Sequence, residues 1–218
     1  LFIGLSVGSG VAVAQALGAE NNQKVHRAIH TAIPTALVGG VILTIVGVTL
    51  SETFLKWMDT PENVLPLSAL YMKIYFAGII FMMLYNFCAA ILRASGDTKS
   101  PLIFLTIAGV INVILNVIFV TVFDLNVAGV ALATTISQAV SAVLVVIALV
   151  KRNDACKLQF SKLRFYKDEL LQIIKIGLPA GIQGSLFSIS NVVIQSSINS
   201  FGEIVMSGNA AALNIEGF

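Results

Sequence analysis

Long apolar runs separated by short polar stretches fill almost the whole chain. Crossing the hydrocarbon core of a bilayer takes about 20 apolar residues in an α-helix. The runs mix Ile, Val and Phe without strict alternation, and a helix satisfies its own backbone hydrogen bonds in lipid. We therefore predict an all-α integral membrane protein, a bundle of many helices. The predicted helices cover residues 1–17, 28–50, 65–92, 102–123, 128–150 and 173–198, and a last one begins at residue 204.

Positive charge alternates between successive polar stretches. Eleven of the 13 Lys and Arg residues lie in three of them, within residues 24–27, 93–99 and 151–175. The stretches between them contribute only Lys56, while Lys73 lies just inside the third apolar run. Loops rich in Lys and Arg stay on the cytoplasmic side of a membrane. We therefore predict that the first, third and fifth loops are cytoplasmic and that the other loops face outward.

Composition supports membrane insertion and excludes several classes of protein. The chain is 57% hydrophobic and 11% charged, whereas charged residues make up about a quarter of a soluble domain. The predicted cytoplasmic loops account for the net charge of +2, so no nucleic-acid partner is indicated. No H-E-x-x-H or Walker motif occurs, so we expect no enzymatic activity, no cofactor and no direct use of ATP.

His and Cys residues are few and do not form the pattern of a metal site. His26 and His30 lie four residues apart, and with no third ligand nearby we expect them to pack and not to bind a metal. Cys88 and Cys156 fall in a span and a cytoplasmic loop, so we expect two free thiols. Residue 1 is Leu and neither end carries a polar tail, so we expect a fragment whose ends lie within spans.

The region 151–172 is the longest and most basic polar stretch. Apolar residues alternate with charged ones between Leu163 and Ile174, as in a helix that lies on the membrane surface. We predict an amphipathic cytoplasmic connector between two membrane parts. Inside the spans, Gly4 and Gly8 form a small-xxx-small pair that lets helices approach closely.

Two prolines, Pro34 and Pro179, lie inside apolar runs. Proline removes a backbone hydrogen bond and bends a helix. A mechanical hinge and a tolerated irregularity both remain open at these two positions.

Polar side chains inside the spans point to function, because their burial in lipid is disfavoured. Asn112 and Asn116 lie one turn apart on one helix face, and Glu216 is a carboxylate well inside a span, which suits it to carrying a proton. Amide and hydroxyl oxygens can coordinate a cation or bind a polar solute. Helix–helix hydrogen bonding is the alternative, especially for Ser and Thr. The candidate residues are Asn112, Asn116, Thr134, Gln183, Ser188, Asn191 and Glu216.

Five motifs follow one another along the chain. They read NFCAAILRASGDTKSP from residue 86, INVILNVIF from 111, GVALATTISQ from 129, IGLPAGIQ from 176 and GNAAALNIEGF from 208. In their order and helix spacing they resemble the multidrug and toxic compound extrusion (MATE) family, and the resemblance covers the whole chain.

The resemblance implies a twelve-helix secondary transporter with two six-helix lobes. Such a protein exports drugs or other amphiphilic, mostly cationic compounds in exchange for Na⁺ or H⁺ by alternating access. Residues 1–150 would then form helices 2 to 6 of the N-terminal lobe, 151–172 the connector, and 173–218 the start of the C-terminal lobe. The implied partners are the bilayer and small organic cations, with no obligate protein partner, in the plasma membrane of a bacterium. A flippase for lipid-linked precursors, with the same superfamily architecture, is the alternative.

The resemblance also implies roles for single residues. In the family's N-lobe ion site, an acid in helix 1 works with polar residues that correspond to Asn112, Asn116 and Thr134, with Thr135 as the neighbouring possibility. These side chains would hold Na⁺ if Na⁺ is the coupling ion, although many relatives carry Asp at the position of Asn116. Some relatives carry Glu in helix 7, where this chain offers Gln183, Ser188 and Asn191.

The loop between the third and fourth spans contains Arg93, Gly96 and Asp97, for which we expect a structural or gating role. Gly96 permits a tight turn, Asp97 can cap the following helix, and Pro101 fits its first turn.

Overall fold

The computed structural model describes residues 2–57 and 65–199, which are helical nearly throughout. Within these two ranges, six α-helices and one 3₁₀ turn follow one another, and a long connection joins α5 to α6. The elements are α1 (Phe2–Gly18), α2 (Asn22–Trp57), α3 (Leu65–Ala94), α4 (Lys99–Thr121), α5 (Asn126–Lys151), η1 (Phe160–Lys162) and α6 (Lys167–Asn199).

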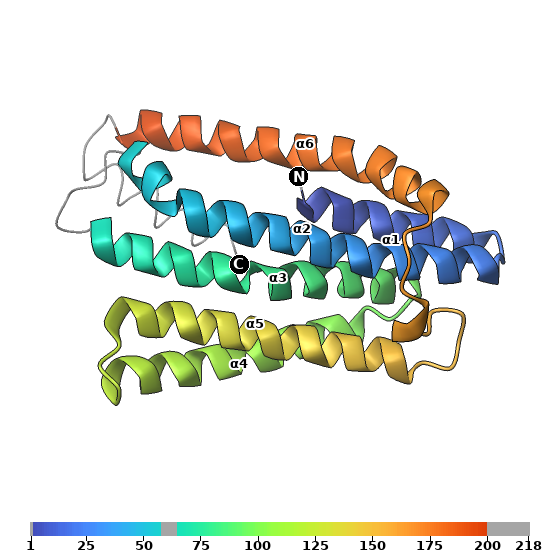
Figure 1. The fold of residues 1–218 in the computed structure, drawn as a ribbon, viewed down its shortest axis with the longest axis horizontal. Coiled ribbons are helices and arrows are strands. Elements are labelled where there is room, and N and C mark those ends of the chain that lie inside the picture. Colours follow the sequence, from blue (N-terminus) through green and yellow to red (C-terminus); the bar gives the residue numbers. More distant parts are fainter. Residues whose placement is uncertain (1, 58–64, 200–218) are drawn as a thin grey trace.

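The helices lie roughly side by side along one long axis (Figure 1). Helices α6 and α1 form one side of the bundle, α2 and α3 its middle, and α5 and α4 its other side. The five helices α2 to α6 are long and apolar enough to cross a membrane, and α1 is a shorter apolar helix. The predicted all-α membrane bundle is thereby confirmed.

The three basic stretches meet at one end of the bundle, which we call the cytoplasmic end. The α1–α2 turn, the α3–α4 turn and the α5–α6 connection all lie there (Figure 1). The α4–α5 turn, residues 122–125, lies at the opposite end, as do the end of α2 and the start of α3 (Figure 1). The alternation of charge along the sequence therefore corresponds to alternation between the two ends of the fold.

The hydrophobic core gathers at the cytoplasmic end. Its largest fully buried side chains come from the start of α2, the end of α3, the end of α5, the connector and the start of α6: Ile29, Phe87, Ile91, Leu92, Leu149, Leu158 and Ile173. Towards the other end the helices expose many Val, Ile and Leu side chains, as expected for surfaces that face lipid. The helices are thus packed most tightly where the basic loops meet.

The predicted surface helix within the connector is wrong. Residues 152–166 contain only the 3₁₀ turn η1, and α6 begins at Lys167 and runs on without interruption. The physical reason is that several backbone N–H groups of the connector donate to α2 and α5, while those that donate within the connector form only isolated turns. Gln159 N–H donates to His30 Nε2 at 3.1 Å, and Leu158 N–H donates to Leu149 O at 3.1 Å.

Helices α1 and α6 cross with almost no space between their backbones. A Cβ atom on Gly8 would lie 2.7 Å from the backbone nitrogen of Gly177, and one on Gly4 would overlap the backbone of Gly181. Only residues without a side chain allow this approach. The small-xxx-small pair predicted from the sequence is therefore a helix contact, and its partner is α6.

Candidate functional site

The two asparagines of α4 face polar side chains of α5. Asn112 Nδ2 donates long hydrogen bonds of 3.4 Å to both Thr134 Oγ1 and Ser137 Oγ. Asn116 Nδ2 donates to Asn112 Oδ1 at 3.0 Å. The structure thus joins Asn112, Asn116 and Thr134, as the sequence predicted, and adds Ser137 to them.

The hydroxyl protons in this cluster point away from α4. Thr134 Oγ1 donates to Val130 O at 3.0 Å, and Ser137 Oγ donates to Thr134 O at 2.9 Å. Because each hydroxyl has given its proton to its own helix, its lone pairs face the space between the two helices. This arrangement presents oxygen acceptors to whatever lies between α4 and α5.

One acceptor of the cluster has no partner. Asn116 Oδ1 is buried and accepts no hydrogen bond. Leaving a buried polar atom unsatisfied costs about 1–3 kcal/mol. The free oxygen is therefore suited to a cation or a donor group that reaches the cluster.

A cavity of about 270 Å³ opens beside the cluster. Both helices contribute polar and small residues to its wall: Leu105, Ala108, Gly109, Asn112, Thr134, Ser137, Gln138 and Ser141. The polar residues of α5 in this wall are spaced by three and four positions, which is one face of a helix. That spacing was readable in the sequence, and it could have singled out Ser137, Gln138 and Ser141.

The structure distinguishes Thr134 from Thr135. Thr134 faces α4, whereas Thr135 faces α3, where its hydroxyl donates to Ile74 O at 3.4 Å. A Cβ atom on Gly78 of α3 would lie 2.6 Å from Cγ2 of Thr135, so that hydroxyl side chain fills a close helix contact. Thr135 is therefore a packing residue in this fold.

The candidates on α6 lie apart from this cluster. Helix α6 packs on α1 and α2, while α4 packs on α5 and α3 at the opposite side of the bundle (Figure 1). Gln183, Ser188 and Asn191 are exposed, and Ser188 lines a separate cavity of about 240 Å³ between α6 and α1. Glu216 lies outside the described residues. The predicted site residues thus form two groups in this chain, one on each side.

The α3–α4 turn has the local structure predicted for it. Gly96 adopts a φ of +86°, a conformation that favours glycine. Asp97 Oδ1 accepts the backbone N–H of Ser100, in the first turn of α4, at 3.0 Å, and this hydrogen bond lowers the pKa of the Asp97 carboxyl. Arg93 is exposed in the last turn of α3. The geometry of Gly96 and Asp97 serves to turn the chain and start α4.

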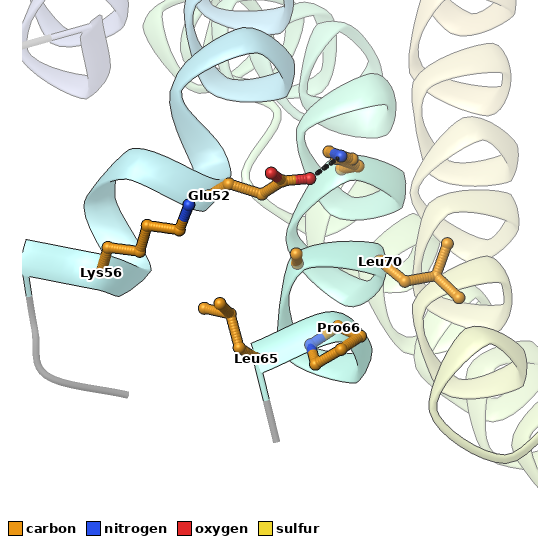
Figure 2. A pocket seen from close by; sticks show the side chains of 7 residues that line it. Glu52, Lys56, Leu65, Pro66 and Leu70 are labelled. Carbon is orange, nitrogen blue, oxygen red and sulfur yellow. Dashed lines mark hydrogen bonds and ion pairs between the residues drawn. The ribbon is translucent and has the colours of Figure 1, made fainter. Parts of the chain in front are cut away.

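A further cavity, of about 400 Å³, lies between the outer ends of α2 and α3. Figure 2 shows Glu52 reaching across to Lys73, with Leu65, Pro66 and Leu70 forming an apolar wall. The ion pair neutralises Lys73, which the sequence places inside an apolar run. Both side chains are about half exposed, so the pair contributes little to stability.

The sequence is similar to a known family and to several known proteins. The family model described as MatE matches residues 1–118. The probable multidrug resistance protein YpnP of Bacillus subtilis is 37% identical over 171 residues, which is 78% of this chain and 38% of that protein. The probable multidrug resistance protein YoeA of the same organism is 34% identical over 209 residues, which is 92% of this chain and 45% of that protein. The chain thus spans less than half the length of these relatives.

Solved structures with the same fold are transporters. A crystal structure of MATE in the bent conformation aligns with a TM-score of 0.89 at 24% identity, over 98% of this chain and 48% of that one. An outward-facing multidrug resistance MATE family transporter aligns with a TM-score of 0.83 at 24% identity, over 90% of this chain and 44% of that one. An inward-facing transporter of the same family aligns with a TM-score of 0.77 at 23% identity, over 82% of this chain and 41% of that one. At these identities the likeness concerns the fold.

Proposed function

Because the chain belongs to the MatE family, we propose that it is part of a secondary active efflux transporter. The full protein exports drugs or other amphiphilic, mostly cationic compounds by alternating access, in exchange for a coupling ion. It acts as a transporter and not as an enzyme. The multi-pass helices and the bacterial relatives support the plasma membrane as its location.

The free Asn116 oxygen is the observation that carries this proposal. This buried acceptor without a partner belongs to a side chain that is hydrogen-bonded to Asn112, and Asn112 in turn contacts two hydroxyl oxygens and lines a cavity. Such a cluster of oxygens suits a cation. Neither an amide nor a hydroxyl titrates near neutral pH. This group of side chains therefore favours Na⁺ over H⁺ as the ion that it binds, with Asn116, Thr134 and Ser137 as ligands.

The position of the lobes' junction supports alternating access. In this proposal the connector separates two lobes, so the α1–α6 crossing joins them. Solved structures of this fold include an inward-facing and an outward-facing multidrug resistance MATE family transporter. A contact made by glycine backbones, without interlocking side chains, is suited to separating and re-forming.

Asn116→Ala in the full-length protein tests the ion site. Removing one ligand oxygen is expected to raise the Na⁺ concentration for half-maximal efflux by about tenfold, which corresponds to a loss of about 1.4 kcal/mol in binding free energy. Efflux of a fluorescent organic cation is measured from cells across a series of Na⁺ concentrations. Asn116→Asp keeps the side-chain oxygen and adds a negative charge. Half-maximal efflux is therefore expected at a lower Na⁺ concentration than in the wild type.

Thr106→Ala is the matched control for this experiment. Thr106 lies on the exposed side of α4 and its hydroxyl donates only to Leu102 O of its own helix, so its Na⁺ dependence should equal that of the wild type. An unchanged Na⁺ dependence in Asn116→Ala would contradict the ion site. Equal retention of organic cations in cells with and without the wild-type transporter would contradict efflux itself and favour the lipid-linked precursor flippase.

A further inference from the structure

The outer surface of the connector combines positive charge with exposed aromatic rings. Phe160 is 59% exposed and Phe165 is 47% exposed. Lys162, Arg164 and Lys167 are exposed around them. No acidic residue occurs from residue 155 to residue 167. We call these five residues the connector face: Phe160, Lys162, Arg164, Phe165 and Lys167.

Buried hydrogen bonds from α2 hold the connector in place. The His30 carbonyl oxygen accepts the backbone N–H of Arg164 at 3.2 Å, and Thr31 Oγ1 accepts the N–H of Tyr166 at 3.2 Å. His30 and Thr31 are both fully buried. The Tyr166 ring lies against the Arg27 guanidinium, 5.4 Å from its centroid. The backbone of the connector is thus directed inward, and the connector face is left at the surface.

The remaining polar partners do not neutralise this face. Asp154 pairs with Arg152 at 2.7 Å, and the Arg152 guanidinium lowers the pKa of the Asp154 carboxyl. Among residues 2–57 and 65–199, no acid forms an ion pair with Lys162, Arg164 or Lys167. The connector face therefore carries three unpaired positive charges.

The fold places this face at the boundary of the bilayer. Helix α5 ends at Lys151 and α6 begins at Lys167, and both are candidate membrane spans. Leu171, one turn into α6, is 64% exposed, and Leu178 is 43% exposed, so apolar side chains that face lipid begin directly beyond the connector. Aromatic rings beside Lys and Arg at this depth match the interfacial layer of a membrane.

We propose that the connector face binds the headgroups of anionic phospholipids in the cytoplasmic leaflet. The three cations contact the lipid phosphates while Phe160 and Phe165 enter the boundary between headgroups and acyl chains. The negative surface potential of that leaflet complements the charge of the face. This contact fixes the membrane depth at which α6 begins.

The test uses the full-length protein in nanodiscs of phosphatidylcholine with increasing fractions of phosphatidylglycerol. Hydrogen–deuterium exchange of residues 157–167 is followed by mass spectrometry. Increasing protection with phosphatidylglycerol is expected at low salt and less at high salt. Inorganic phosphate added to phosphatidylcholine nanodiscs should give no protection. Exchange that is the same with and without phosphatidylglycerol would overturn the proposal, and would indicate that the rest of the protein covers the face.

A double variant, Lys162→Gln with Lys167→Gln, tests the connector face. Its control is a second double variant, Lys99→Gln with Lys151→Gln, which removes two other exposed lysines from the same end of the bundle. At the phosphatidylglycerol fraction that half-protects the wild type at low salt, the ratio of protected to unprotected protein should be about tenfold or more lower for the first pair, because each lysine near an anionic surface contributes noticeably to binding. The second pair should stay near the wild type. Equal losses in both pairs would show only a diffuse attraction of the basic end and would overturn the proposal. The wild-type titration stands if a variant misfolds.

Discussion

At the scale of single residues, His30 and Asn116 show two different environments of a buried polar atom. His30 is fully buried, and both ring nitrogens are used: Nδ1 lies 2.7 Å from His26 O, and Nε2 accepts the Gln159 N–H. The ring is therefore the neutral tautomer with its proton on Nδ1. Asn116 Oδ1 is the contrasting case, because it is buried with no partner. The hydrogen-bonded His30 ring therefore has a structural role, whereas the unpartnered Asn116 oxygen is suited to a ligand.

His30→Ala is expected to loosen the connector. The substitution leaves the Gln159 N–H without its acceptor, at a cost of about 1–3 kcal/mol in the local free energy of opening. Trypsin added to inside-out vesicles should then cleave faster at Lys157, Lys162 and Arg164, as measured by the appearance of fragments.

Thr35→Ala is the control for that experiment, since the Thr35 hydroxyl bonds only to Thr31 O of its own helix. Its cleavage rate should match that of the wild type. Unchanged cleavage of His30→Ala would show that the contact does not hold the connector.

At the scale of helices, two kinds of packing occur. Helices α1 and α6 contact each other through their backbones, whereas α4 leaves most of its apolar surface exposed. The α1–α6 crossing relies on glycines in backbone contact. Helix α4 packs mainly on α5 and exposes most of its apolar side chains, among them Leu102, Val113 and Val117. The close crossing is sensitive to added volume, whereas the exposed face is not.

Gly8→Ala is expected to destabilise the α1–α6 crossing. The new methyl group would overlap backbone atoms of α6, which cannot move away as a side chain can, so we expect a loss of about 1–3 kcal/mol. The measurement is thermal unfolding of the purified full-length protein in detergent, together with efflux.

Gly184→Ala on α6 provides the comparison, because a Cβ atom there meets nothing within 4 Å. It should unfold at or slightly above the wild-type temperature, given the helix preference of Ala over Gly. Equal melting temperatures for the two variants would argue against the close crossing.

At the scale of the whole molecule, the described helices are packed most tightly at the cytoplasmic end. The core lies there, and Gln172 Nε2 of α6 donates to Gln15 Oε1 of α1 at 2.8 Å. Under the proposed alternating access, this end must open for a substrate to enter from the cytoplasm. The Gln15–Gln172 contact is then made and broken in each transport cycle.

Linking these two positions should stop transport. In a Cys88→Ala, Cys156→Ala background, Gln15→Cys with Gln172→Cys is joined by a short, reducible bifunctional thiol reagent. Efflux of a fluorescent cation is expected to cease on linking and to return on reduction, whereas either single cysteine variant should be unaffected. Continued efflux from fully linked protein would contradict opening at this end.

Several features follow from the sequence alone because they depend on local properties. Span length, helical periodicity and the side preference of Lys and Arg act on short segments, so the helices and the common end of the basic loops were predictable. The pairing of Asn112 with Asn116 one turn later follows in the same way. The turn at Gly96 and Asp97 also belongs here, since glycine and a capping carboxylate act within a few residues.

Other features depend on which surfaces of distant segments meet, and only the tertiary structure decided them. Nothing local distinguishes Thr134 from Thr135, yet one faces α4 and the other faces α3. The connector has the apolar and charged pattern of a surface helix, but hydrogen bonds to His30, 129 residues away, keep it extended. Periodicity describes the faces that a segment can present, whereas packing selects the partner that satisfies its backbone and buries its side chains.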